Sequence, residues 1–277
     1  MSYIHWDVDP VFVRIGGFPI YYYSLLFIGG TVLSVWILKR LFRENGIPWV
    51  NLQLLVVWST VSLFIGARLG HCLFYEPDYF LAHPLEIFLP ITAKAGGGYL
   101  FTGYQGMASH GGALGLIVAL IFYSRCRHQP VILTLDYIAI VLPLAAAFIR
   151  IGNLMNSEMI GIPTAMAGAF VFERVDAIPR HPAQLYEAMA YLAVFFLNIG
   201  LYRKTGMGKY PGLYWGIMLL LVFVARFGIE FVKEKQIPLE EGMILDLGQI
   251  LSIPFILIGI VFLIYAFKKK GLSGQTA

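Results

Sequence analysis

The sequence predicts an all-α integral membrane protein with seven transmembrane helices and a small extra-cytoplasmic cap formed by two long loops. Three observations predict this fold class: apolar residues of the AVILMFWYC set make up 58% of the 277 residues, charged residues only 13%, and the mean hydropathy is +0.74. Soluble proteins carry about 25% charged residues. At about 20 residues per crossing, residues 1–277 form a single polytopic membrane domain. The net charge of +4 favours an anionic lipid surface as partner, and no nucleic acid is expected.

Long apolar runs predict the seven helices, because each run is long enough to cross the hydrocarbon core once. The helices are expected at residues 18–38, 52–74, 107–124, 133–152, 183–202, 210–232 and 247–267. Two long connections, residues 75–106 and 153–182, form the expected cap. The first connection is rich in glycine, which favours a mobile or closely approaching loop over a regular element. In the second, the alternation over residues 169–175 predicts a short strand.

The clustered basic residues predict the orientation of the chain. Nearly all of them follow the first, third, fifth and seventh predicted helices, namely Lys39, Arg40, Arg43, Arg125, Arg127, Arg203, Lys204, Lys209, Lys268, Lys269 and Lys270. By the positive-inside rule that side is the cytoplasm. The N-terminus and both long connections then face outward, and the C-terminus is cytoplasmic. Cys72 and Cys126 fall on opposite sides of this plan, so no disulfide is expected.

Ionisable residues within the predicted helices lie almost entirely in the outer half of the membrane. They are Arg68, His71, His110, Arg150, Glu187, Arg226 and Glu230, and Asp136 alone falls in the inner half. A charge near the centre of a membrane helix costs roughly 3 kcal/mol or more, so it normally faces protein, water or a partner. The pattern therefore predicts an outward-facing polar chamber, for which a phospholipid headgroup is the nearest anion.

Each member of this set also has a structural interpretation. Arg226 and Glu230 are four residues apart and could pair only with each other. Arg68 could extend to the headgroups, and His71 could be a packing residue. Glu187 could anchor a helix end or pair with an arginine.

A dense polar run begins at Arg150. Arg150, Asn153 and Asn156 share a helical face. They form either a network that caps the outer end of helix 133–152 or, with a planar guanidinium beside amide donors, a receptor for a phosphate or carboxylate.

Six blocks of sequence carry a resemblance to a known family. They are Gly66-Ala-Arg68-Leu-Gly70, Ser109-His110-Gly111-Gly112, Arg150-Ile-Gly-Asn153-Leu-Met-Asn156-Ser-Glu158-Met-Ile-Gly161, Arg180-His181-Pro182-Ala-Gln184-Leu-Tyr186-Glu187, Arg226-Phe-Gly-Ile-Glu230 and Gly248-Gln249-Ile-Leu-Ser252. In this order they resemble the prolipoprotein diacylglyceryl transferase family, and the resemblance spans the chain. The sequence departs from the family pattern at Ser24, Ile149 and Lys233, where the family usually has Gly, Gly and Arg.

The resemblance implies a reaction and a location. A diacylglyceryl group passes from phosphatidylglycerol to the lipobox cysteine thiol of a preprolipoprotein, which forms a thioether and releases glycerol 1-phosphate. The implied partners are phosphatidylglycerol, preprolipoproteins and the bilayer of the bacterial cytoplasmic membrane, with no metal or organic cofactor. The family's essential positions fall on Tyr23, His110, Arg150, Asn153, Gly161, Glu187, Arg226 and Glu230.

We expect three of these residues to be catalytic. His110 would serve as the base for the thiol, because imidazole titrates near neutral pH. Arg150 and Arg226 would stabilise the departing phosphate. The expected substrate-binding residues are Tyr23, Asn153, Asn156, Gly161, Arg68, Glu187 and Glu230.

Two other functions remain open from the residues alone. An anion or lipid transporter could use the same chamber, although the inner half holds only Asp136 to continue a path. A purely structural membrane scaffold would leave the clustered arginines without a purpose.

Overall fold

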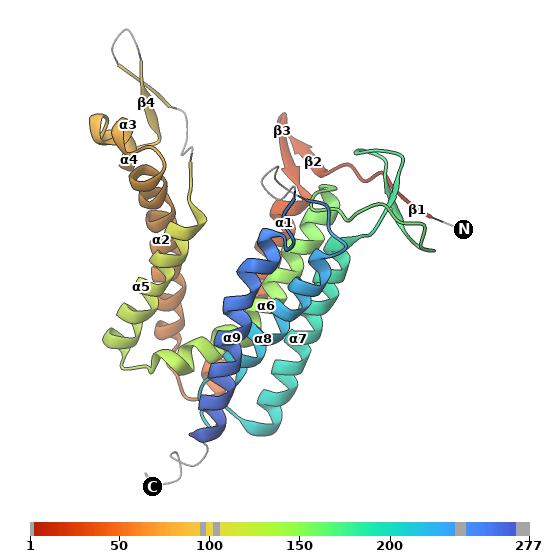
Figure 1. Ribbon diagram of the computed structural model, residues 1–277. Coiled ribbons are helices and arrows are strands. Elements are labelled where there is room, and N and C mark those ends of the chain that lie inside the picture. Colours follow the sequence, from red (N-terminus) through yellow and green to blue (C-terminus); the bar gives the residue numbers. More distant parts are fainter. Residues whose placement is uncertain (1–2, 95–97, 102–105, 236–241, 270–277) are drawn as a thin grey trace. The chain divides into compact units, whose positions relative to one another are not determined.

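The computed structural model describes residues 3–94, 98–101, 106–235 and 242–269 (Figure 1). The chain divides into two compact units. We call residues 1–41 with 135–277 the first unit, and residues 42–134 the second unit. The prediction of a single membrane domain stays a prediction.

The described part of the chain is mostly helical. Its helices are α1 (Tyr22–Glu44), α2 (Trp49–Phe74), α3 (Pro77–Ala82), α4 (Leu85–Phe88), α5 (Ser109–Arg127), α6 (Val131–Met155), α7 (Ala183–Thr205), α8 (Leu213–Glu230) and α9 (Leu247–Lys268). Its strands are β1 (Ile4–Trp6), β2 (Val11–Ile15), β3 (Phe18–Tyr21), β4 (Ile91–Ala93), β5 (Tyr99–Phe101), β6 (Phe170–Phe172) and β7 (Pro179–Arg180). The prediction of a mostly helical protein is confirmed, but the all-α prediction is incomplete, because the N-terminal segment and the two long connections contain short paired strands.

Six of the described helices, α1, α2, α6, α7, α8 and α9, are long and apolar enough to cross a membrane. They make the chain a multi-pass membrane protein. The helix predicted at residues 107–124 forms as α5, but it is not among the six. A seventh span and a single outer cap stay predictions.

The first predicted helix begins later than expected, at Tyr22 instead of residue 18. Residues 18–21 form β3, which pairs antiparallel with β2. Gly16 and Gly17 make the turn between them with φ of 56° and 85°, values that glycine adopts without strain. The boundary was wrong because an apolar strand and an apolar helix have the same hydropathy.

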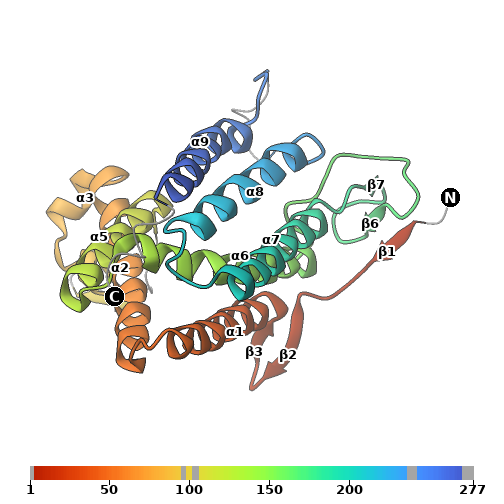
Figure 2. The ribbon, with the colours of Figure 1, turned by 90° about the horizontal axis from the view of Figure 1, so that it is seen from below.

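In the first unit, α6 is the most buried of the candidate spans. The amide of Asn198 on α7 donates to the carbonyl oxygens of Ala139 on α6 (3.0 Å) and Tyr214 on α8 (3.3 Å). Ser34 of α1 donates to the carbonyl of Val141 (3.3 Å). Figure 2 shows these helices from below, with α8 between α7 and α9. Side-chain to backbone hydrogen bonds thus join four of the apolar helices.

Asp136 has a structural role at the start of α8. Its fully buried carboxylate accepts hydrogen bonds from the backbone N–H groups of Gly212 (2.6 Å) and Trp215 (2.9 Å). The first N–H groups of a helix have no partner within the helix, and here the carboxylate supplies one. This cap explains the presence of Asp136, the one ionisable residue that the sequence predicts in the inner half of the membrane.

We expect Asp136→Ala to lower the free energy of unfolding by about 1–2 kcal/mol, because two N–H groups lose their acceptor. Asp136→Asn, which keeps one side-chain oxygen, should lose less. Thermal unfolding of the purified protein in detergent measures both variants. An unchanged melting temperature for Asp136→Ala would show that the cap contributes nothing.

A three-stranded sheet forms beside the end of α6, in the strand order β1-β6-β7. β1 runs parallel to β6, and β7 pairs antiparallel with β6. Its core contains Leu154, Ile160, Phe170 and Phe172, and the Trp6 indole donates to the carbonyl of Leu154 (3.0 Å). The short strand predicted within residues 169–175 is confirmed as β6, whereas the contribution of the N-terminal segment was not predicted.

In the second unit, α2 and α5 cross at glycines. A Cβ added at Gly66, Gly70, Gly111 or Gly115 would overlap backbone atoms of the opposite helix. Small residues four apart allow such close approach of helices in a membrane.

The connection expected to be irregular contains α3, α4 and the β4–β5 hairpin, so that prediction is wrong for these segments. Pro77 is the first residue of α3. An N–H at this position has no acceptor within the helix, so the absence of an N–H in proline costs no hydrogen bond. Gly96, Gly97 and Gly103, on which the expectation of a mobile loop partly depended, lie outside the described residues. Cys72 and Cys126 are both free thiols in the structure.

Candidate functional site

Polar residues of the first unit gather where several of its helices begin or end. Arg150 lies near the end of α6, Glu187 near the start of α7, and Glu230 is the last residue of α8. Within this unit α6, α7 and α8 alternate in direction, so these ends meet on one side of the bundle. The basic residues Arg43, Arg203 and Lys268 belong to the opposite ends of α1, α7 and α9.

Four charged side chains form a buried ionic cluster, made of Arg150, Glu187, Glu230 and Lys233. Arg150 Nε lies 2.6 Å from Glu187 Oε2. Lys233 Nζ lies 3.4 Å from Glu230 Oε2 and 4.0 Å from Glu187 Oε1. The side chains of Glu187, Glu230 and Lys233 are 1%, 7% and 4% exposed. Two cations balance two carboxylates, as burial of charge requires.

Amide groups extend this cluster from Arg150. Arg150 Nη1 donates to Asn153 Oδ1 (3.2 Å), and the amide of Asn153 donates to Glu158 Oε2 (3.3 Å). Asn156 donates to the other oxygen of Glu158 (3.2 Å). The predicted shared face of Arg150, Asn153 and Asn156 is therefore one network joined by Glu158. It fixes the guanidinium, which is 16% exposed, and both the capping and the anion-receptor interpretations stay predictions.

Arg226 and Glu230 do not pair with each other, so the interpretation as an i,i+4 ion pair is wrong. Glu230 pairs with Lys233 instead. Within the described part of the chain, Arg226 makes no hydrogen bond or ion pair, although its charge acts on the Tyr191 hydroxyl together with those of Glu187 and Arg150. Arg226 therefore adds a positive charge near the four-residue ionic cluster.

Gly161 lies between two backbone segments that approach it closely. Its N–H donates to the carbonyl of His181 (2.9 Å), and it forms an antiparallel bridge with Lys233. A Cβ at Gly161 would lie 2.5 Å from the carbonyl oxygens of His181 and Val232. Gly161 therefore allows the segment that carries Lys233 to reach the cluster.

Tyr23, at the start of α1, packs against the end of α6. A Cβ added at Gly152 would lie 2.8 Å from the Tyr23 ring. Tyr23 thus packs against α6 two residues after Arg150.

Arg180, which lies in β7, connects Gly161 to the segments that carry Asp176 and Glu234. Its guanidinium pairs with Asp176 (2.6 Å) and Glu234 (3.1 Å) and donates to the carbonyl of Gly161 (3.3 Å). Its hydrogen bonds hold the pKa of the Asp176 carboxyl below its ordinary value. The Asp176 pair therefore stabilises the fold at neutral pH, and its contribution falls as the pH drops through that lowered pKa.

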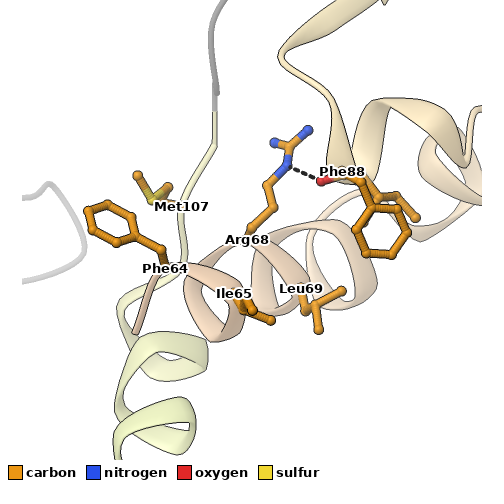
Figure 3. Close-up of a pocket in the computed structure, with 7 residues that line it drawn as sticks. Phe64, Ile65, Arg68, Leu69, Phe88 and Met107 are labelled. Carbon is orange, nitrogen blue, oxygen red and sulfur yellow. Dashed lines mark hydrogen bonds between the residues drawn. The ribbon is translucent and has the colours of Figure 1, made fainter. Parts of the chain in front are cut away.

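Two of the predicted site residues, Arg68 and His110, belong to the second unit. Arg68 donates hydrogen bonds to the carbonyl oxygens of Glu86, Ile87 (3.2 Å) and Gly106 (3.4 Å). These bonds join α2 to the connection that follows it, so Arg68 does more than extend to the headgroups. It also lines a pocket of about 460 Å³ with Phe64, Ile65, Leu69, Ile87, Phe88 and Met107 (Figure 3). His110 is exposed near the start of α5. A single chamber that contains His110 and both arginines stays a prediction.

His71, also in the second unit, has its own partners. It lies 3.5 Å from Glu76, and Gly106 approaches its ring so closely that a Cβ there would overlap it. The packing interpretation of His71 therefore fits these contacts. Among the described residues, no group of three His, Cys, Asp or Glu side chains could hold a metal ion.

Lys233, Glu158 and Arg180 were not among the predicted site residues. Lys233 had been noted only as a departure from a family pattern, and Arg180 and Glu158 only as members of motifs. The signal for Lys233 was its position three residues after Glu230, which suits an i,i+3 ion pair.

Comparison with known proteins places these residues in a family. Residues 10–265 match the model of the family described as prolipoprotein diacylglyceryl transferase. Several relatives are named phosphatidylglycerol--prolipoprotein diacylglyceryl transferase. The relative from Bacteroides fragilis is 44% identical over 98% of both chains. The relative from Tolumonas auensis is 40% identical over 96% of this chain and 99% of its own, and that from Rhodospirillum rubrum is 36% identical over 96% and 95%.

Proposed function

The chain belongs to the prolipoprotein diacylglyceryl transferase family, and on that premise we propose that it transfers the diacylglyceryl group of phosphatidylglycerol to the lipobox cysteine thiol of preprolipoproteins. The reaction forms a thioether and releases glycerol 1-phosphate. The observation that carries the proposal in this chain is the pair of arginines in the first unit. Arg150 is fixed by Glu187 and Asn153, and Arg226 is left without an ionic partner among the described residues.

The chemistry requires an anion site and a base. The cysteine sulfur attacks the glycerol carbon that bears the phosphate ester, the C–S bond forms and the C–O bond breaks. The electron pair of that bond leaves on the phosphate oxygen, and the thiol proton passes to the base, for which we propose His110. A free thiol is mostly protonated at neutral pH, so the base raises the fraction of the reactive thiolate.

The remaining residues have supporting roles in this proposal. Arg150 and Arg226 bind the phosphate and stabilise the charge that grows on it, because fixed donors in a poorly hydrated site act more strongly than donors in water. Glu187 orients Arg150, and Tyr23, Asn153 and Asn156 shape the headgroup site. Gly161, Glu230 and Arg68 complete the proposed substrate-binding set.

The proposed topology has seven spans, with α5 as the seventh, in the bacterial cytoplasmic membrane. The N-terminus and the ionic cluster face outward, and the C-terminus is cytoplasmic. The basic residues at the opposite ends of α1, α7 and α9 support this orientation under the positive-inside rule. Both long connections then lie outside, where preprolipoproteins present the lipobox cysteine.

The experiment that tests the function combines purified protein, labelled phosphatidylglycerol and a lipobox peptide. Mass spectrometry should detect a peptide heavier by one diacylglyceryl group, and glycerol 1-phosphate should appear in equal amount. A peptide with Ser in place of the lipobox Cys should give no product. Transfer of phosphatidylglycerol between leaflets without a thioether product would instead support the transporter.

A further inference from the structure

Arg226 and Glu230 carry opposite charges on one helix but do not pair with each other. Both residues lie on α8, four positions apart, where opposite charges normally face each other. The Glu230 carboxylate nevertheless lies 3.4 Å from Lys233, and Arg226 has no ion pair to a described residue. The nearer lysine has replaced the pairing that the helix spacing favours.

The position of Lys233 is fixed by backbone contacts. Its N–H donates to the carbonyl of Glu230 (3.2 Å), and it forms a bridge with Gly161. Its side chain is 4% exposed, so the ammonium group stays among the carboxylates instead of turning to solvent.

The position of Glu230 is equally restricted. Its carboxylate lies against Gly248 at the start of α9, where a Cβ would come within 2.6–2.7 Å of the carboxylate atoms. The contacts of Glu230 on one side and of Lys233 on the other therefore keep the pair together.

We infer that Lys233 is a positioning residue for the transfer reaction: by neutralising Glu230, it keeps Arg226 from pairing with that carboxylate and leaves its guanidinium available to the lipid phosphate. This inference rests on the proposed function. Without Lys233, Glu230 is a buried carboxylate with no ionic partner among the described residues. Such a group draws in the nearest cation, and Arg226 is one helical turn away.

The test compares four variants with the wild type: Lys233→Met, Lys233→Arg, Glu230→Gln and the double variant Lys233→Met/Glu230→Gln. Binding is measured with a fluorescent phosphatidylglycerol in phosphatidylcholine nanodiscs, and transfer is measured with the lipobox peptide. Lys233→Met should weaken binding and lower kcat/KM by roughly thirtyfold or more. Lys233→Arg should remain within about fivefold of the wild type, since it keeps the charge.

The double variant separates positioning from folding. Glu230→Gln removes the carboxylate that competes for Arg226, so the double variant should bind phosphatidylglycerol about tenfold or more tightly than Lys233→Met. In a Glu230→Gln background, adding Lys233→Met should change binding little. The comparison of the double variant with Glu230→Gln can be made even if Lys233→Met alone does not fold. Lys235→Met is the matched control, because Lys235 belongs to the same segment and its side chain is 44% exposed.

The inference is overturned if folded Lys233→Met binds phosphatidylglycerol as tightly as the wild type. It is also overturned if the lysine substitution weakens binding as strongly in the Glu230→Gln background as in the wild type. The proposed function fails separately, if the wild type itself forms no thioether in the same assay.

Discussion

Replacement of Arg150 by Gln is expected to lower the rate of diacylglyceryl transfer by about a hundredfold or more. The guanidinium is held by Glu187 at 2.6 Å and by Asn153 at 3.2 Å, so it is oriented before substrate binds. A neutral glutamine cannot balance the charge that develops on the departing phosphate. The initial rate of thioether formation, with phosphatidylglycerol in nanodiscs and saturating peptide, measures the loss.

Arg150→Lys should also be strongly impaired, because an ammonium group lacks the planar fork that can hold Glu187 and phosphate at once. The matched control is Arg174→Gln, since Arg174 belongs to the same unit and its side chain is 41% exposed. This control should keep the wild-type rate. A folded, inserted Arg150→Gln protein with wild-type turnover would remove Arg150 from the mechanism.

Gly161→Ala is expected to reduce transfer by about tenfold to a hundredfold, although it adds only one methyl group. The new Cβ would lie 2.5 Å from two carbonyl oxygens, those of His181 and Val232. These are backbone atoms, which cannot change rotamer as a side chain can. The segments that carry His181 and Val232 must therefore move away from residue 161. Lys233 follows Val232 directly and would move away from Glu230, and displacements near 1 Å are enough to cost such factors in rate.

Gly200→Ala provides the control for this substitution. Gly200 lies within α7, and a Cβ there meets no atom within 4 Å. The control should retain full activity and should have equal or higher thermal stability, because alanine favours the helix. Equal activity of Gly161→Ala and Gly200→Ala would show that the close approach at Gly161 has no role in the reaction.

The membrane helices could be predicted from the sequence because their signal is local. Apolar length alone located α7 and α9, which begin at Ala183 and Leu247 as expected. The same signal was wrong at residues 18–21, since hydropathy does not separate an apolar strand from an apolar helix. Pro19 and the glycine pair before Phe18 were the only local signs of a hairpin.

The site could be predicted only where helix direction determines it. Alternating helices bring the end of α6 and the start of α7 together, and Arg150 and Glu187 are in contact there. The partner of Glu230 could not be deduced in this way. Arg226 at i−4 and Lys233 at i+3 were both candidates by spacing, and the pairing of the chain after α8 with Gly161 decides for Lys233. Such pairing between distant segments leaves no periodic signal in the sequence.

The most direct test of the anion site is a structure of the protein with phosphatidylglycerol bound, determined by cryo-electron microscopy without a thiol acceptor so that no turnover occurs. The account predicts phosphate oxygens within hydrogen-bond distance of both Arg150 and Arg226, with Glu230 still paired to Lys233. A phosphate bound elsewhere, with both guanidinium groups turned toward acyl chains or toward carboxylates, would contradict it.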